Sequence, residues 1–279
     1  MTRVALVTGA NQGLGLALAR GLARRLEKND IVYLCARNED RGLAAVASLG
    51  ETRAAVKLGL LDVTKPESIA NFAAKLQADH GGIDIVVSNA AARMVKDRPQ
   101  EEQVRQLIAT NNHGSRALLG ALWPLLNPKA RYVMVASGFG RLSLLPCTLR
   151  PLFDTNTLSF DDIEGTMDAY VAAAEAGTAK AEGWPEWINV PSKIGQVATA
   201  RIAARKIAQE RPEANIMFNA VCPGLVDTDA SRPWFDNMDE AQNPDDAARA
   251  ILDLVLASPE QDLPKGELVQ FGKVLPWLD

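Results

Sequence analysis

Three glycines with a fixed spacing near the start of the chain form a motif that could hold a phosphate. The segment Thr8-Gly9-Ala10-Asn11-Gln12-Gly13-Leu14-Gly15 follows the apolar run Val4 to Val7 and precedes an Ala/Leu-rich stretch. Glycine lets the backbone turn sharply and approach a ligand closely, and the N-terminus of the following helix favours negative charge. The motif therefore predicts a strand–loop–helix unit that binds the pyrophosphate of a dinucleotide.

Arg37 could decide which dinucleotide binds. It belongs to Cys35-Ala36-Arg37-Asn38, where the second strand is expected to end. An acidic residue there would hold a ribose hydroxyl and repel a 2′-phosphate. A guanidinium can instead grip a phosphate through two parallel hydrogen bonds, so we expect the cofactor to be NADP(H).

Short β-branched runs alternate with helical stretches along the whole chain. The runs typical of buried strands are Val4 to Val7, Ile31 to Leu34, Ile85 to Val87, Tyr132 to Val135 and Ile216 to Val221. The helical stretches are Leu14 to Leu26, Arg41 to Leu49, Pro66 to Ala78, Glu101 to Leu126, Ser192 to Glu210 and Pro244 to Leu256. This alternation predicts an α/β fold with a doubly wound parallel sheet of Rossmann type, in a single domain over residues 1–279.

Composition excludes several classes of protein. The chain has 279 residues, 47% of them hydrophobic, and a net charge of −4, which gives no reason to expect nucleic acid or an anionic membrane as partner. Three dispersed cysteines and two histidines make neither a disulfide framework nor a metal site. No apolar run is long enough for a membrane span, so we expect a cytoplasmic protein that acts on a small molecule.

The region 146–188 interrupts the alternation of strands and helices. It carries no strand pattern, only loop residues and an acidic Ala-rich helix from about Asp161 to Ala181. Apolar Ile163, Met167 and Tyr170 recur there at helical spacing. The insert either decorates the surface or caps the substrate site. We favour a cap, because insertions near the carboxyl ends of strands usually shape the ligand crevice.

Further motifs lie where the strands end. They are Asp62-Val63, Ser88-Asn89-Ala90-Ala91, Asn111, Ser137, Lys193 and Pro223-Gly224-Leu225-Val226-Asp227-Thr228. With the glycine loop, they make the chain resemble the short-chain dehydrogenase/reductase superfamily over its whole length. Within it the chain is similar to the monomeric carbonyl reductases, which share Ala36-Arg37 and a long insert ending in Glu182-Gly183-Trp184-Pro185. The resemblance implies a monomer, although a small homo-oligomer stays open.

The resemblance also implies a role for each motif. Asp62 and Val63 would flank the adenine, and Asn89 would support the nicotinamide ribose. Lys193 would hold the ribose hydroxyls, Asn111 would belong to a water relay, and Ser137 would orient the substrate oxygen. Thr228 would meet the carboxamide. Ala90, Pro223, Gly224 and Val226 complete the expected cofactor-binding set.

The main departure from the family pattern is at position 189. The family's acid is a tyrosine four residues before the lysine, and here Asn189 occupies that position in Asn189-Val190-Pro191-Ser192-Lys193. An amide can donate a hydrogen bond, but it cannot supply a proton as a phenol can. The three tyrosines lie elsewhere, and only Tyr170, in the insert, could reach the site.

Three interpretations of this departure stay open. The chain is a carbonyl reductase with a substitute acid, or a non-redox NADP(H)-binding protein, or a reductase whose substrate needs no proton. An iminium is such a substrate, because hydride arrives at a cationic carbon and the product is a neutral amine. A carboxylate would then stabilise the cation. We favour the iminium, with Asp168 as the carboxylate and Arg141 near the substrate.

Lacking this tyrosine, the chain also resembles a small fungal branch of the superfamily. Its members are NADPH-dependent reductases of prenylated indole alkaloid biosynthesis that also direct an intramolecular Diels–Alder reaction. This resemblance implies imine reduction coupled to a cyclisation. The catalytic set that we expect from all these arguments is Asp168, Arg141, Ser137, Asn189, Lys193 and Asn111.

Overall fold

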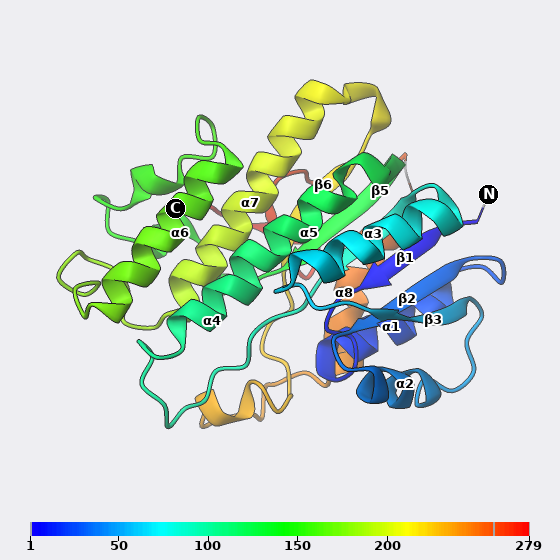
Figure 1. Ribbon diagram of the computed structural model, residues 1–279, viewed down its shortest axis with the longest axis horizontal. Coiled ribbons are helices and arrows are strands. Elements are labelled where there is room, and N and C mark those ends of the chain that lie inside the picture. The colour runs from blue at the N-terminus through cyan, green and yellow to red at the C-terminus, as the bar shows by residue number, and fades with distance from the viewer. Residues whose placement is uncertain (1, 259, 279) are drawn as a thin grey trace.

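The computed structural model describes residues 2–258 and 260–278, which build one eight-stranded sheet between layers of helices (Figure 1). The strand order is β3-β2-β1-β4-β5-β6-β7-β8, parallel throughout except for the antiparallel β7–β8 pair. The strands are β1 Val4–Val7, β2 Ile31–Ala36, β3 Ala55–Leu60, β4 Ile83–Ser88, β5 Leu126–Val135, β6 Met217–Cys222, β7 Leu268–Gln270 and β8 Lys273–Leu275. The strand order reverses between β1 and β4, where open α/β sheets bind ligands.

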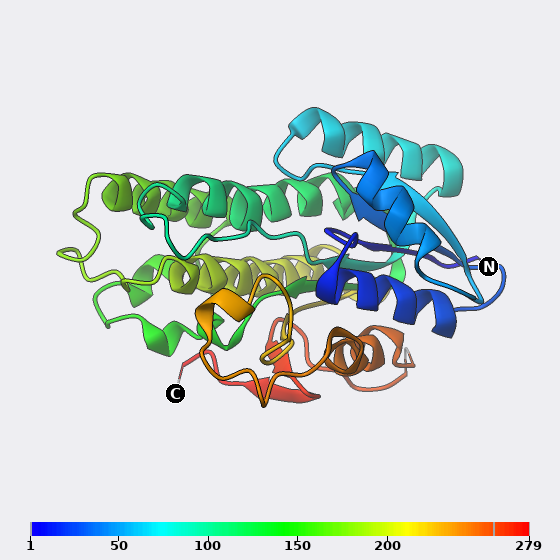
Figure 2. The same ribbon diagram turned by 90° about the horizontal axis from the view of Figure 1, so that it is seen from below.

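Helices cover both faces of this sheet, as Figure 2 shows. One face packs on α1 (Gly13–Arg25), α2 (Glu39–Ala47) and α8 (Pro244–Leu256). The other packs on α3 (Pro66–His80), α4 (Val104–Ile108), α5 (Ser115–Leu122), α6 (Phe160–Glu175) and α7 (Asn189–Glu210). Because both faces are covered, inner strands such as β1 and β6 are apolar at nearly every position, as the sequence pattern indicated. The doubly wound fold is confirmed.

Three strands were missing from the apolar runs that predicted the sheet. β3 is an edge strand with several exposed side chains, so its sequence AVKLGL alternates instead of forming an apolar run. β7 and β8 are only three residues each. Short and edge strands give a weak apolar signal because water covers part of them.

The stretch predicted as one helix from Glu101 to Leu126 has a change of pitch at its centre. α4 runs into a π-helical segment, η1 (Ala109–Gly114), and then into α5 and the 3₁₀ turn η2 (Trp123–Leu125). π-helical segments are rare and occur mostly at functional sites. This one carries Asn111. The remaining short 3₁₀ turns are η3 Gly138–Gly140, η4 Leu142–Leu144, η5 Arg150–Phe153, η6 Pro212–Ala214 and η7 Arg232–Trp234.

The helix of the insert 146–188 packs into a helical layer, and of the described insert residues Trp187 lines the cavity discussed below. This helix, α6, lies beside α7 and α4 and buries Ile163, Met167 and Tyr170 against them. A Cβ on Gly195 of α7 would lie 2.7 Å from Met167 Sδ, so the two helices approach very closely. The insert therefore thickens one helical layer. The apolar residues of α6 face that layer. Hydrophobic periodicity shows that one face of a helix is buried, but it does not show whether that face packs on other helices or on a substrate site.

Candidate active site

The loop between β1 and α1 has the shape expected of a pyrophosphate cradle. Gly9 has a φ of 61°, and a Cβ on Gly15 would lie 2.4 Å from the Gly9 carbonyl oxygen. Gln12 is the N-cap of α1, and its side chain makes no capping hydrogen bond. The first amides of α1 are therefore available to an anion. Asn11 and Leu14 belong to the same loop and helix start.

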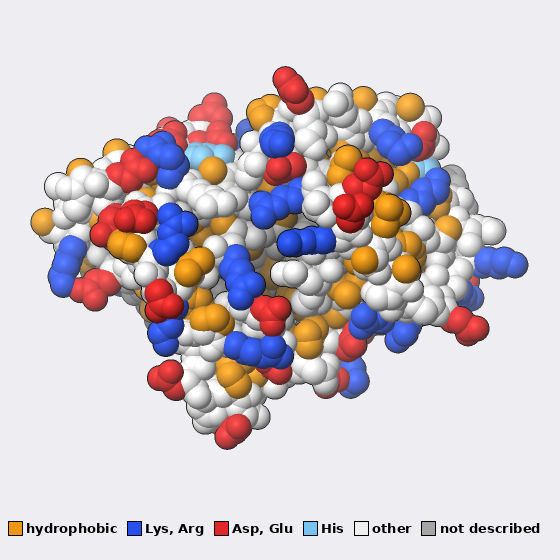
Figure 3. All heavy atoms as spheres, turned by 60° about the horizontal axis from the view of Figure 1, so that its bottom comes forward, with side chains coloured by type: hydrophobic (Ala, Val, Ile, Leu, Met, Phe, Trp, Pro, Cys, Tyr) orange, Lys and Arg blue, Asp and Glu red, His pale blue; other side chains and the backbone are white. Residues whose placement is uncertain are grey.

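Arg37 and Asp62 lie close together at the carboxyl ends of β2 and β3. Burial raises the pKa of Asp62, but hydrogen bonds from Thr64 and the charges of Lys65 and Arg37 outweigh it and hold that pKa below its usual value. The Arg37 side chain is exposed at the start of the β2–α2 loop. Around the hollow near the centre of the face shown in Figure 3, several Lys and Arg side chains gather. Such a face suits a ligand that carries phosphates.

Asn89 fixes the glycine loop to the end of β4. Its side-chain amide donates to the carbonyl oxygens of Thr8 and Gly9, at 2.9 and 3.3 Å. The backbone amides of Asn89 and Ala90 both donate to Thr8 Oγ1, at 2.9 Å. A Cβ on Gly9 would lie 2.9 Å from Ala90 Cα, so the two loops are in close contact.

Thr228 lies opposite the start of α1. A Cβ on Gly13 would be 3.4 Å from Thr228 Cγ2, so the segment after β6 closes against the glycine loop. Val63, after β3, instead reaches the π-helical segment, because a Cβ on Gly114 would lie 2.7 Å from its carbonyl oxygen. The predicted nucleotide residues thus gather along one edge of the sheet, and they fit a dinucleotide.

A cavity of about 740 Å³ opens beside this cradle, at the carboxyl ends of β4 to β7. Its lining includes five of the six predicted catalytic residues, Asn111, Ser137, Arg141, Asn189 and Lys193, and the cofactor candidates Leu14, Pro223, Gly224, Val226 and Thr228. Segments far apart in sequence therefore converge on one cavity. Its volume is in the range of small-molecule sites.

Lys193 is the buried cation of this cavity. It lies in the first turns of α7 and is 8% exposed. Nζ donates to the Val135 carbonyl oxygen at 3.2 Å and to Gln196 Oε1 at 2.8 Å. Burial lowers the pKa of Lys193 to about 8.

A buried hydrogen-bond network joins η1 to α7. Asn111 Nδ2 donates to Ser192 Oγ at 3.1 Å, and Asn111 Oδ1 accepts from the Ala92 amide at 2.9 Å. Ser192 Oγ donates to Asn112 Oδ1 at 3.0 Å. The network sets the position of Lys193, which follows Ser192 directly. The sequence marked Ser192 only as part of a motif, and its position beside the lysine was the available signal.

Asn189 lies one helical turn before Lys193, on the same side of α7, and both line the cavity. None of the lining residues that the structure describes is a tyrosine, a histidine or a carboxylate. Tyr33, Tyr132 and Tyr170 are all buried in the core, and burial raises the pKa of each. Tyr170 therefore packs in the core, which is the role expected for it over a place in the site.

The structure places Asp168 outside the cavity, contrary to prediction. Its side chain is 73% exposed on the outer face of α6, and Oδ1 lies 3.0 Å from His113 Nε2. Met167, next to it, points into the helical layer and is fully buried. Successive residues of a helix point about 100° apart, so a buried Met167 turns Asp168 to solvent.

Aromatic side chains that the sequence analysis gave no role form one wall of the cavity. Phe139 and Trp187 meet edge to face with ring centroids 4.7 Å apart, and Trp187 lies 6.1 Å from Trp234. Trp187 is the one lining residue that the insert contributes among those described. Phe235 and Leu225 add to the apolar surface. The available signal was an aromatic residue two positions after Ser137 and another two positions before Asn189.

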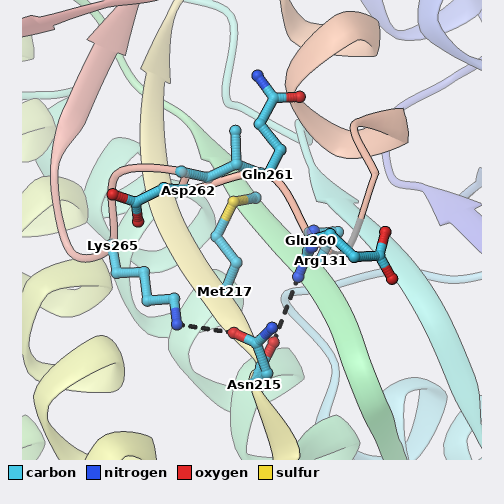
Figure 4. A pocket seen from close by; sticks show the side chains of 8 residues that line it. Arg131, Asn215, Met217, Glu260, Gln261, Asp262 and Lys265 are labelled. Carbon is cyan, nitrogen blue, oxygen red and sulfur yellow. Dashed lines mark hydrogen bonds between the residues drawn. The ribbon is translucent and has the colours of Figure 1, made fainter.

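A second, smaller hollow lies at the amino ends of β5 and β6 (Figure 4). Its volume is about 200 Å³, and Arg131 and Lys265 both donate to Asn215 there, at 3.3 and 2.8 Å. Glu260 and Asp262 balance the two cations, and the hollow contains none of the predicted site residues. Over the described ranges, no helix is long and apolar enough to cross a membrane, and no cluster of side chains could ligate a metal.

Comparison with known proteins agrees with this geometry. A family model described as short chain dehydrogenase matches residues 3–146, a little over half of the chain. Carbonyl reductase [NADPH] 1 of Mus musculus is 35% identical over 278 residues, covering 98% of each chain. Carbonyl reductase [NADPH] 3 of Rattus norvegicus is 34% identical over 280 residues, covering 99% of each.

Two solved structures share the fold at lower sequence identity. Salutaridine reductase from Papaver somniferum has a TM-score of 0.77 at 22% identity, covering 95% of this chain and 99% of that one. Menthone neomenthol reductase from Mentha piperita has a TM-score of 0.76 at 23% identity, covering 98% and 100%. From the family match and the full-length relatives, the chain belongs to the short-chain dehydrogenase family.

Proposed function

We propose that this protein is an NADPH-dependent reductase that acts on the carbonyl group of a bulky, apolar or aromatic small molecule. The observation that carries the proposal is the cavity in which Ser137, Asn189 and Lys193 meet an aromatic wall beside the glycine loop. Its relatives named carbonyl reductase [NADPH] support the same reaction and cofactor.

Each part of the cofactor has a place on this chain. The uncapped amides of α1 would hold the pyrophosphate, Arg37 the 2′-phosphate, and Asp62 with Val63 the adenine side. Asn89 and Thr228 would hold the nicotinamide end. When bound there, NADPH supplies a hydride.

The side chains of the cavity position the substrate and stabilise its oxygen. Ser137 and Asn189 each carry an N–H or O–H that can donate to a carbonyl oxygen and stabilise the charge that develops on it. Phe139, Trp187 and Trp234 exclude water and pack against flat apolar groups. Arg93 and Arg141 are also in the lining, so a substrate with an acidic group is favoured over a cationic one.

Reduction of an iminium, the interpretation first favoured from the sequence, has weaker support than carbonyl reduction. A carboxylate next to the cation would stabilise it, and the described lining holds none, whereas Asp168 lies on the outside. The cavity residues give no specific support for a coupled Diels–Alder cyclisation. Non-redox binding of NADP(H) remains the alternative that the experiment below separates.

The proposal is tested by following deuteride from labelled NADPH into aromatic ketones, aldehydes and quinones, with a cyclic iminium alongside. Deuterium should appear on the carbinol carbon by mass spectrometry. Ser137→Ala should slow ketone reduction about 10²-fold by removing one donor, whereas Ser143→Ala, outside the lining, should not. Faster, Ser137-independent transfer to the iminium would favour that substrate. Tight NADPH binding without transfer to any compound would favour non-redox binding.

A further inference from the structure

The cavity offers few groups that can release a proton. Its ionisable lining residues, within the part of the chain that the structure describes, are Arg93, Arg141, Lys193 and Cys222. A guanidinium does not deprotonate in a protein. Carbonyl reduction nevertheless needs a proton at the oxygen, so the donor is Lys193, Cys222 or water.

The position of Lys193 allows it to donate directly into the cavity. Its ammonium group has three N–H donors. Two are used by the Val135 carbonyl and by Gln196, and the third is left for a ligand in the cavity that Lys193 lines. Asn189, one turn earlier, ends in a short amide, so the ammonium is not screened from the substrate by a longer side chain.

The surroundings of Lys193 also suit proton release near neutral pH. The groups that face it are the Val135 carbonyl from β5, Gln196 from its own helix and Cys222 from β6. The other charged groups of the described lining are Arg93 and Arg141, and none is a carboxylate. Burial lowers the pKa of Lys193 to about 8 and raises the pKa of Cys222. Lys193 therefore loses its proton first as pH rises. A pKa near the working pH is what a general acid requires.

We propose that Lys193 is the general acid of the reduction. Its ammonium transfers one proton from Nζ to the substrate oxygen while the carbonyl carbon accepts the hydride of NADPH. The C=O π bond breaks, one C–H and one O–H bond form, and the products are the alcohol, NADP⁺ and a neutral Lys193 amine that solvent reprotonates. This inference rests on the proposed carbonyl reduction and names the acid that replaces the phenol of the family pattern.

The first test is the pH profile of kcat/KM with the best ketone of the panel. Lys193 is active when protonated, so the rate should be constant below about pH 8 and fall about tenfold per pH unit above it. Cys222→Ser should leave the position of this limb unchanged. A limb that disappears in Cys222→Ser, or a rate that stays flat through pH 10, overturns the proposal.

The second test reads the proton on Lys193 without turnover. In protein labelled with ¹³C at lysine Cε, the resonance that Lys193→Met removes should titrate near pH 8. Lys206→Met, which changes a lysine 46% exposed on the same helix, should leave that resonance and its midpoint unchanged. A Lys193 midpoint above about 10 overturns the proposal.

The third test separates proton donation from cofactor binding. Lys193→Arg keeps a cation at this position but cannot release a proton. Its NADPH affinity by calorimetry should stay within about tenfold of wild type, while ketone reduction falls about 10²–10⁴-fold. Lys206→Met serves as the control and should lose neither. If Lys193→Arg reduces ketones normally, the proposal fails while carbonyl reduction stands. If wild type transfers deuteride to no carbonyl compound, the function and the proposal both fail.

Discussion

At the carboxyl ends of β1 and β2, the site is shaped by the backbone of the glycine loop. At the carboxyl ends of β5 and β6, it is formed by side chains from distant segments of the chain. In the first half, Gly9 and Gly15 leave room that any Cβ would fill. In the second, Ser137, Lys193 and Trp234 come from three separate parts of the chain. A backbone cradle is specified by a few adjacent residues and can be recognised in sequence. A side-chain cavity exists only after the chain has folded, so its chemistry has to be established from the structure.

Disrupting the glycine loop should have the largest effect on NADPH affinity. In Gly15→Ala the new Cβ would lie 2.4 Å from the Gly9 carbonyl oxygen, so the loop must shift away from the pyrophosphate position. NADPH affinity, measured by calorimetry, should fall about 10³-fold, or roughly 4 kcal/mol. Gly165→Ala is the control, because nothing lies within 4 Å of its Cβ, and it should bind NADPH normally. Normal affinity in Gly15→Ala would show that the cradle does not hold the nucleotide.

A substitution at Asn189 tests the half of the site that side chains form. Asn189→Tyr places a phenol one turn before Lys193, and a positioned acid contributes about 10²–10⁴-fold. In the Lys193→Arg background, which has lost its own acid, ketone reduction should therefore rise about 10²-fold in a steady-state assay of NADPH oxidation. Asn189→Phe adds the same ring without the hydroxyl and should give no gain. Equal rates in the two variants would show that the cavity cannot use a phenol at this position.

Arg37 should have a smaller and more selective effect. Arg37→Met removes a cation from the end of β2, so NADPH should bind about tenfold more weakly, a loss of about 1.4 kcal/mol, while NADH affinity stays the same. Arg41→Met, on the exposed side of α2, should change neither affinity. Calorimetric titration of both nucleotides decides the point. A parallel loss for NADPH and NADH would mean that Arg37 does not contact the 2′-phosphate.

Most of the fold was predictable because its signals are local. The apolar run Val4 to Val7 and the glycines after it predict the first strand–loop–helix unit. The alternation of strands and helices continues as far as α8. The edge strand β3 was missed because exposed positions interrupt its apolar pattern. The change of pitch at Asn111 leaves no mark in a hydrophobic pattern, since a π-helical segment of six residues is too short to shift that pattern.

The site residues fall into the same two groups, those that a local motif predicts and those that only the fold brings together. The glycine loop and Lys193 were predicted and fall beside or within one cavity, as their motifs required. Asp168 was chosen because it neighbours Met167, but one step along a helix turns a side chain by about 100°. Trp234 could not be assigned at all, because the path of the segment after β6 decides where it lies. Motifs identify residues that act through local geometry, and folding alone determines which other residues meet them.

Asp168→Asn should have the smallest effect of these changes, and it separates the iminium from the carbonyl substrate. The Asp168 carboxylate is 73% exposed, points away from the cavity and pairs with His113, so its charge is largely screened by water. Exposed pairs of this kind contribute little to stability, so Tm should shift by no more than about 2 °C. Deuteride transfer to the best ketone should stay within about twofold of wild type. His113→Gln, which removes the partner of the same pair, is the matched control and should behave alike. A loss of tenfold or more in Asp168→Asn, with His113→Gln unaffected, would mean that α6 brings this carboxylate to the substrate during turnover. If that loss appears in transfer to the cyclic iminium and not in transfer to the ketone, the carboxylate acts by stabilising a cation, and the case for an iminium would then be stronger than the case for a carbonyl.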